Sequence, residues 1–234
     1  MPNSTFAQLP SKQKKKIFKI CVQLLAANGY CHTTIKMITR RLKVADGYLH
    51  YYFSGKADLV EWLIDAGMEQ WTAHFRKNVD PAGASDVFEL VKLIILQQIR
   101  FTRDHRQVFA AYHTVMNEPN FPLIAYLVEK LSTIDRFVGD SIAHAVRTGA
   151  VRPGTSPELV AMFMDLIITR MQEFAYDGVY DPLGVSRMNE AQVGALIDRI
   201  MAMLRDGIAA PPQAAPSGAD AAAEAADSPG AEST

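Results

Sequence analysis

The chain has 234 residues, of which 49% are hydrophobic, and its formal net charge is -1. This length and composition are ordinary for a globular protein with a real core, arranged as one large domain or two smaller ones. The two cysteines, Cys21 and Cys31, exclude a disulfide scaffold, and Cys31-His32 lacks further ligands at zinc spacing. Because no signal peptide and no apolar run of transmembrane length is visible, we expect a soluble, cytoplasmic protein with no membrane partner.

The small net charge hides an uneven distribution of charges along the chain. Residues 1–45 contain nine Lys and Arg residues and neither Asp nor Glu. An acid-free basic end on a nearly neutral protein indicates a polyanionic partner, with nucleic acid as the first candidate. A merely solvated, lysine-rich terminus is the alternative explanation.

The first residues in chain order predict an arm and a helix. Residues 1–10 are expected to form a flexible arm. Apolar side chains at helical spacing over residues 12–28 predict an amphipathic helix, which Gly29 ends as a C-cap. Cys21 lies on the apolar face of this helix and is expected to pack as a small hydrophobe. Lysines cluster in the first turns of the helix, where they oppose its dipole, so the placement favours nearby phosphates.

Residues 34–59 carry the most informative pattern of the chain. Thr33-Thr34 supplies hydroxyl groups that can cap a short helix, in which Ile38 and Leu42 lie on the buried side. Residues 43–45 form a predicted turn, and residues 45–52 a second short helix. Two short helices joined by a tight turn, with basic side chains on one side, are typical of a helix-turn-helix.

The remaining sequence predicts helix after helix. A long helix is expected over residues 56–78, followed by helices over 87–103, 107–117, 123–148, 157–176 and 189–206. No alternating pattern of strands is present, so the predicted class is all-α. The predicted organisation is an arm over 1–10, a helix-turn-helix domain over 11–56, a helical body over 57–207 and a disordered, acidic Ala/Pro-rich tail over 208–234.

The helix-turn-helix segment resembles the DNA-binding signature of the TetR family of bacterial transcriptional regulators. Eleven residues stand in register with that signature: Gly29, Tyr30, Thr33, Thr34, Ile38, Gly47, Leu49, Tyr51, Phe53, Lys56 and Leu59. The usual turn glycine of the family is Lys43 here, which must take the turn conformation at some cost in strain. The usual N-cap serine is Ala45. The stretch from Val44 to Gly47 is also similar to a branch of the family that senses fatty acyl-CoA.

The resemblance implies which residues contact DNA. Thr34 and Lys56 stand at helix starts where the family holds phosphates, and Lys36 stands where some relatives reach a guanine edge. Ala45 could meet a thymine methyl group, and Asp46 could accept from cytosine or instead cap its helix. The complete expected set is Thr34, Lys36, Arg40, Lys43, Ala45, Asp46, Gly47, Tyr48, His50, Tyr51, Tyr52 and Lys56.

The resemblance also implies a homodimer that reads a palindromic operator and is released by a small hydrophobic or amphipathic ligand. The side chains expected to line the ligand site are Phe101, Phe109, Tyr112, His113, Met116, Phe163, Met164, Ile167 and Arg170. For each of them a place in an ordinary helical core is the alternative, and a salt bridge is the alternative for Arg170. The side chains expected at the dimer interface are Leu159, Met171, Phe174, Val193, Ile197, Ile200, Met201 and Leu204.

Two other functions compete with a ligand-released repressor. A DNA-binding protein of the same type could be controlled by a protein partner in place of a small molecule. A helical lipid-binding or carrier protein is the alternative from another class, but it would not need the acid-free basic end. The six histidines are scattered without a base–nucleophile pairing, so we expect neither an enzyme, a metal site nor a cofactor.

Overall fold

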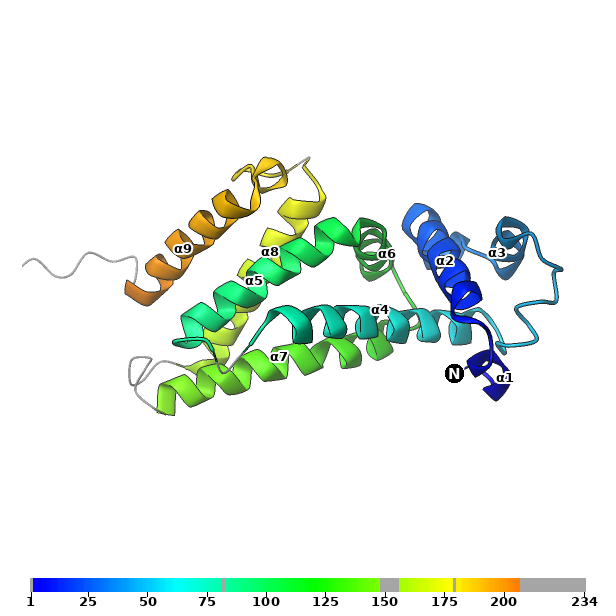
Figure 1. The fold of residues 1–234 in the computed structure, drawn as a ribbon, viewed down its shortest axis with the longest axis horizontal. Helices are drawn as coiled ribbons and strands as arrows, with labels where there is room; N and C mark the ends of the chain where they lie inside the picture. Colours follow the sequence, from blue (N-terminus) through cyan, green and yellow to red (C-terminus); the bar gives the residue numbers. More distant parts are fainter. Residues whose placement is uncertain (1, 81–82, 148–155, 179, 207–234) are drawn as a thin grey trace, which may run out of the picture.

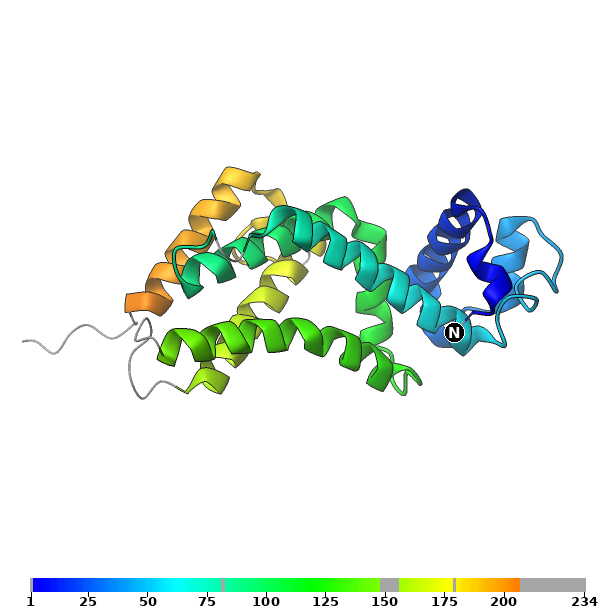
Figure 2. The same cartoon turned by 60° about the horizontal axis from the view of Figure 1, so that its bottom comes forward.

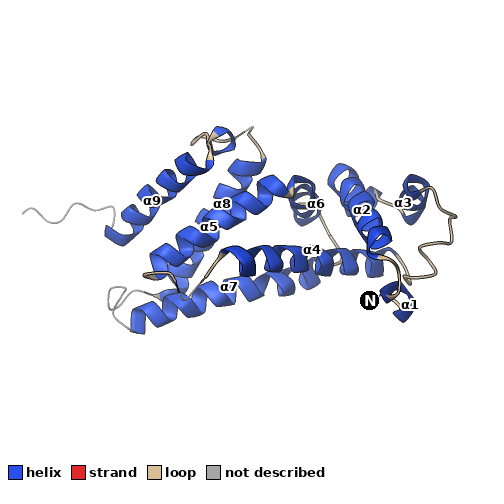
Figure 3. Cartoon of the chain, in the orientation of Figure 1, coloured by secondary structure: helices blue, strands red, loops and turns tan. Residues whose placement is uncertain are grey.

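The computed structural model describes residues 2–80, 83–147, 156–178 and 180–206, and this part of the chain is helical without a strand (Figure 3). The predicted all-α class is therefore confirmed. The elements are α1 (Ser4–Ala7), α2 (Ser11–His32), α3 (Ile35–Leu42), α4 (Lys56–Asn78), α5 (Val87–Asp104), α6 (Arg106–Met116), α7 (Ile124–Arg147), α8 (Pro157–Tyr176), the 3-10 turn η1 (Val185–Arg187) and α9 (Glu190–Asp206).

The helices form an elongated molecule with α1, α2 and α3 at one end (Figure 1). The long helix α4 leads from that end into a body built from α5 to α9, and Figure 2 shows α7, drawn in green, separating from α4 toward the far end of the body. Helix α6 packs against α2, while α5 packs against α8 and α9. Contacts between α2 and α6 therefore connect the N-terminal end directly to the body.

Helix boundaries follow the capping residues of the sequence. The Ser156 hydroxyl accepts from the Leu159 N–H at the start of α8, and the Asp86 carboxylate accepts from the Glu89 N–H at the start of α5. Gly29 interrupts α2 with a φ of 69°, a conformation that glycine adopts without steric cost. The expected end of the helix over 123–148 and the expected tail over 208–234 lie outside the described residues.

Two hydrophobic cores hold the molecule together. The first combines α1 to α4 with residues of α6, of α7 and of the loop between them, including Ala111, Val115 and Phe121. The second lies among α5, α8 and α9. Cys21 is fully buried in the first core, as expected, and burial raises the pKa of its thiol to about 12. Because the first core includes body residues, the N-terminal end does not pack as an isolated unit.

The expectation of a flexible arm over residues 1–10 is wrong. Ser4–Ala7 forms the short helix α1, and Phe6 is only 2% exposed. The Phe6 ring packs against Phe53 and Trp62, with ring centroids 4.8 and 4.9 Å apart. A polar stretch with one isolated phenylalanine carries no helical period, so its partners could not be read from local sequence.

None of the described helices combines the length and the apolar character that crossing a lipid bilayer requires.

Candidate DNA-binding interface and ligand cavity

Helix α3 presents basic side chains on a well-anchored surface. The Thr34 hydroxyl accepts a hydrogen bond of 3.2 Å from the Met37 N–H, so Thr34 caps α3 as predicted. Ile38 and Leu42 are buried against α2, which leaves Lys36 and Arg40 exposed to solvent. Neither Lys36 nor Arg40 has a hydrogen bond or ion pair to another described side chain, so both cations are available to a partner.

The turn after α3 has the strained conformation that its sequence predicts. Lys43 lies in the left-handed region with φ 59° and ψ 50°, which costs a residue with a Cβ atom about 1 kcal/mol. The Val44 N–H bonds to the Thr39 carbonyl at 3.1 Å, and Lys16 Nζ bonds to the Leu42 carbonyl at 3.2 Å. These bonds fix the turn and hold the exposed Lys43 side chain beside α3.

Residues 45–52 were expected to form an α-helix and form successive turns instead. The Tyr48 and Tyr52 N–H groups bond to carbonyls three residues back, whereas the Tyr51 N–H bonds four residues back to Gly47. Leu49 is completely buried and anchors the segment. Without a serine cap at position 45 and with Gly47 in its first turn, the segment has a weak tendency to be a continuous helix.

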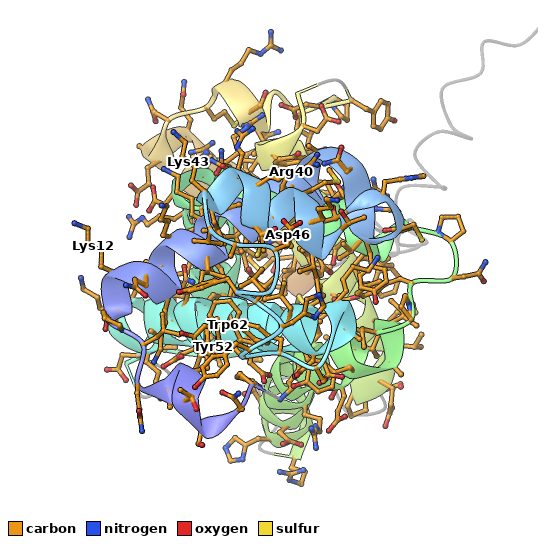
Figure 4. All side chains as sticks on the ribbon, turned by 90° about the vertical axis from the view of Figure 1, so that its right-hand side faces the viewer. Lys12, Arg40, Lys43, Asp46, Tyr52 and Trp62 are labelled. Atoms are coloured by element: carbon orange, nitrogen blue, oxygen red, sulfur yellow. The ribbon has the colours of Figure 1, made fainter. Side chains whose placement is uncertain are left out.

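The exposed side of this turn segment comprises Ala45, Asp46, Gly47, His50 and Tyr51. The Asp46 carboxylate accepts from the Thr39 hydroxyl at 3.4 Å and so connects the segment to α3. Figure 4 looks onto this end of the molecule and shows Arg40 and Lys43 on one side of Asp46, with Lys12 at the edge on α2. Exposed polar and basic side chains that could contact DNA are therefore gathered on one face of the N-terminal end.

Three of the expected DNA contacts face other protein groups. Tyr48 is half-buried and donates to Gln13 on α2 at 3.3 Å, and Tyr52 packs against Phe6. Lys56 Nζ donates to the Tyr30 carbonyl at 3.0 Å and lies over the Tyr30 ring. Tyr48 and Lys56 thus direct their polar atoms at protein partners, and the Tyr52 ring packs into the protein, so these three side chains lie behind the exposed face of the turn segment.

Sequence reasoning missed the part that α1 plays at this surface. The Asn3 side chain donates to the Tyr51 carbonyl at 2.6 Å, and the Asn3 N–H donates to the Tyr52 carbonyl at 3.0 Å. Both bonds satisfy carbonyl groups at the end of the turn segment, where no further helical turn follows. An asparagine in a short polar terminus carries no signal that its partners lie about fifty residues away.

A large apolar cavity of about 610 Å³ lies between the N-terminal end and the body. Its walls come from α2, α4, α5, α6, α7 and α8, and most of its lining side chains are aliphatic or aromatic. The volume lies within the range of sites for drug-sized ligands. Phe18, Val22 and Leu25 of α2 form one wall, so the helix that precedes α3 touches the same space as the body helices.

Four of the expected ligand residues, Phe101, Phe109, Tyr112 and Met116, line this cavity. The other five do not. Met164 and Ile167 pack into the second core, and His113 lies against Phe109 and Tyr176. Phe163 is 53% exposed, and Arg170 forms a surface ion pair with Glu173. The side chains of α8 that line the cavity lie on a different face of the helix from the expected ones. Helical periodicity identifies an apolar face of α8 but does not show which face borders the cavity.

Several lining residues were not anticipated. They include the α2 wall, the α4 side chains Val60, Leu63, Ile64, Met68 and Trp71, and the polar side chains Gln98, Asp165, Thr169 and Gln172. The apolar ones read as ordinary core from sequence. No local sequence pattern indicates that these side chains line a cavity.

A basic groove of about 340 Å³ adjoins the apolar cavity and shares Phe18, Val22 and Val108 with it. Lys19, His105 and Arg106 supply basic side chains, and Asp104 supplies one acid. Lys19 and Arg106 are exposed, and the Arg106 guanidinium lies 5.1 Å from the centroid of the Tyr176 ring. The pair of spaces can accept a molecule with a long apolar part and an anionic head.

The carboxylate of Glu118, in the loop after α6, holds the N-terminal end against the body. It accepts from the Tyr30 N–H at 2.5 Å and from the Cys31 N–H at 2.6 Å, the two groups that follow the break at Gly29. A Cβ atom at Gly29 would lie 2.8 Å from Glu118 Oε2, so both the space and the positive φ require glycine there. Partial burial alone would raise the pKa of Glu118, but the hydrogen bonds from Cys31 and Tyr30 outweigh it and hold that pKa below its usual value.

Most of the side chains expected at a dimer interface face inward. Met171, Phe174, Val193, Ile197 and Met201 are buried in the second core, so they cannot meet a second copy. Ile200 and Leu204 are half-buried against the same core, and Leu159 is exposed. The most regular apolar stripe of α9 therefore packs against the core of its own protomer.

The described part of the chain is thus an all-helical protein that carries the short helix α3 and the turn segment 45–52 at one end and a ligand-sized cavity beside its helical body. Residues 17–63 match the sequence model of bacterial regulatory proteins, tetR family. The N-terminal part of the chain, from α2 into α4, is therefore similar to the tetR family of bacterial regulatory proteins.

Three similar proteins illustrate the relationship. The fatty acid metabolism regulator protein of Bacillus subtilis (strain 168) is 20% identical over 152 residues, which cover 63% of this chain and 77% of that protein. A TetR family transcriptional regulator from Chloroflexus aurantiacus shares the fold with a TM-score of 0.72 at 21% identity, over 88% of this chain and 98% of the other. The structure of FadR from Bacillus subtilis in complex with stearoyl-CoA is similar with a TM-score of 0.67 and 19% sequence identity. The match covers 84% of this chain and 100% of the other.

The bonds at Glu118 predict a pH-dependent contribution to stability. We expect Glu118→Gln to lower the free energy of unfolding at pH 7 by about 1 to 2 kcal/mol, because charge-assisted bonds to two N–H groups are weakened. The folded pKa is depressed, so the stabilisation is present above the ordinary carboxyl pKa of 4.5 and is lost as the pH falls through the folded value. Urea denaturation between pH 3 and pH 7 measures the difference.

The matched control is Glu129→Gln, which changes an exposed acid on α7 and should leave the unfolding free energy unchanged at every pH. A Glu118→Gln variant as stable as the wild type at pH 7 would show that the carboxylate does not join the two parts of the molecule.

Proposed function

We propose that this protein is a homodimeric repressor that binds a palindromic operator and leaves it when a long-chain fatty acyl-CoA binds. Residues 11–56 would read DNA, and residues 57–207 would bind the ligand and dimerise. The observation that carries the proposal is the cavity whose walls include both α2 and the body helices. A ligand there touches the reading end and the body at once.

The proposed DNA contacts follow from exposure and charge. Lys36 would reach a base edge, and Ala45 would meet a thymine methyl group. Thr34, Arg40, Lys43 and Tyr51 would contact phosphates and fix the register, together with the exposed lysines of α2. In a dimer, two such surfaces would enter successive major grooves roughly 34 Å apart.

The proposed ligand class rests on the two adjoining spaces and on a relative. The apolar cavity suits an acyl chain, and the basic groove with Lys19 and Arg106 suits the phosphates of a coenzyme A head. A structural relative with a TM-score of 0.67 was solved in complex with stearoyl-CoA. A formed cavity of this size also favours a small-molecule ligand over control by a protein partner alone.

Release would follow from a difference in affinity between two states. A ligand shifts the equilibrium only if it prefers the state that does not bind DNA. An acyl chain between α2 and α6 can supply that preference, because it changes how the two helices pack. The Glu118 carboxylate would pass the change to Tyr30 and Cys31, which lie directly before α3.

The proposed dimer uses the exposed apolar stripe of α8. Leu159, Met162, Phe163 and Leu166 are about half exposed and follow the spacing i, i+3, i+4, i+7 of one helix face. Such a stripe on the surface suits packing against the same helix of a second copy, as in a helix bundle. Leu159 is the member of the originally expected set that belongs to this face.

Selection of bound DNA from a random pool tests the DNA-binding part of the proposal. We expect a palindromic winner, and we expect Arg40→Ala to weaken binding to all sequences and to reduce the salt slope by about 1. Lys36→Ala should cost about 1 to 3 kcal/mol and relax the preference at one base pair in each half-site.

Lys77→Ala serves as the control, because Lys77 is exposed near the far end of α4. A pool without an enriched sequence, or equal salt slopes for the wild type and Arg40→Ala, would contradict this reading surface.

The proposed dimer interface on α8 can be tested with a single substitution. A buried charge without a partner is strongly unfavourable, so Phe163→Glu should convert the dimer to monomers at micromolar concentration. Sedimentation velocity measures the mass. Val128→Glu places the same charge on α7, where the native side chain is 50% exposed, and should leave the dimer intact. Dimeric Phe163→Glu protein would exclude this face of α8 as the interface.

A further inference from the structure

Gln98 of α5 is a buried amide in the wall of the apolar cavity. Its side chain lines the cavity, and the residue is only 6% exposed. Around it the cavity surface is mostly hydrocarbon. A buried amide in such surroundings needs hydrogen-bond partners for both its oxygen and its nitrogen.

The orientation of the amide is fixed by its partners. Trp71 Nε1 donates to Gln98 Oε1 at 2.9 Å, and Gln172 Nε2 donates to the same oxygen at 3.1 Å. An indole nitrogen is only a donor, so the group that faces Trp71 has to be the amide oxygen. The nitrogen of Gln98 consequently points away from both donors.

That nitrogen has no partner in the described part of the chain. No hydrogen bond joins Gln98 Nε2 to a described residue, although the oxygen has two. Among the described side chains, the polar atom that is both unpaired and sealed from solvent is Thr102 Oγ1. Gln98 Nε2 is therefore unpaired but open to space, and the space that Gln98 borders is the cavity.

The other polar lining residues differ from Gln98 in position. Asp165 and Thr169 are exposed on the surface of α8, so they lie where the cavity opens. Gln172 donates to Gln98 and supports it. Gln98 is thus a buried and unpaired N–H donor held in a fixed orientation at the wall of the apolar cavity.

We propose that Gln98 selects ligands by donating a hydrogen bond to a carbonyl oxygen on a long-chain molecule. Trp71 and Gln172 are positioning residues that orient the amide. The inference rests on the proposed function for the identity of that carbonyl, which in an acyl-CoA is the thioester oxygen. A hydrocarbon without an acceptor would fill the cavity but leave the donor unpaired, and a site with such a group discriminates against that ligand.

Two pairs of probes, each differing by one carbonyl group, test the proposal. One pair is stearoyl-CoA and its S-octadecyl thioether, and the other is dodecan-2-one and dodecane. Binding is measured for the wild type, for Gln98→Met, which keeps the length but removes the donor, and for Gln97→Met. Gln97 is a buried neighbour that accepts from His74 and Arg100 and does not line the cavity, so it is the matched control.

We expect the wild type and Gln97→Met to bind the carbonyl member of a pair about ten-fold tighter than the other member. In Gln98→Met the two members should bind within about two-fold of each other. Equal binding of both members by the wild type, or discrimination that survives in Gln98→Met, would overturn the proposal.

The two pairs separate this inference from the proposed function. The protein could bind dodecan-2-one more tightly than dodecane and bind neither coenzyme A compound. That result supports Gln98 as the donor and rejects acyl-CoA as the ligand. If neither pair binds, the cavity takes no such molecule and the inference fails.

Isotope-edited infrared spectroscopy gives a readout that does not depend on the folding of a variant. The carbonyl stretch of the bound probe should lie below its frequency in hexane if Gln98 donates to it. A hexane-like frequency in the wild type would overturn the proposal.

Discussion

The carboxylate of Glu118 joins two parts of the molecule that otherwise meet through apolar packing and through the hydrogen bond from the Thr114 hydroxyl to the Ala26 carbonyl. Gly29 breaks α2, and the break leaves the N–H groups of Tyr30 and Cys31 without helical partners. Glu118 satisfies both from the loop after α6, and Lys56 binds the Tyr30 carbonyl from the start of α4. Residues Tyr30 and Cys31, which precede α3, are therefore held by a carboxylate of the body.

The same two helices form walls of the apolar cavity. Side chains of α2 and α6 line one space, and α2 packs against α6 along its length. Apolar packing is dense and not continuously deformable, so a chain inserted between two helices has to separate or rotate them. In the proposed mechanism, the hydrogen bonds of Glu118 to Tyr30 and Cys31 hold one end of this contact while the helices move.

Local features were predictable from sequence, and packing partners were not. Thr34 as a cap and Lys43 in a left-handed turn follow from side-chain chemistry and from the number of residues between the helices. Phe6 and Gln98 depend on residues far away in the chain, so no window of sequence identifies the buried arm or the unpaired amide. The α9 stripe around Ile197 was assigned to a dimer, because amphipathic periodicity shows that a face is covered but not by which molecule.

Linkage between ligand and operator tests the central claim most directly. The affinity for the selected operator is measured by fluorescence anisotropy with and without saturating stearoyl-CoA, and the affinity for stearoyl-CoA with and without operator. The account predicts that each weakens the other by the same factor, of about ten-fold or more. Stearoyl-CoA that binds the protein but leaves the operator affinity unchanged would contradict it, because the shared cavity would then not control the reading end.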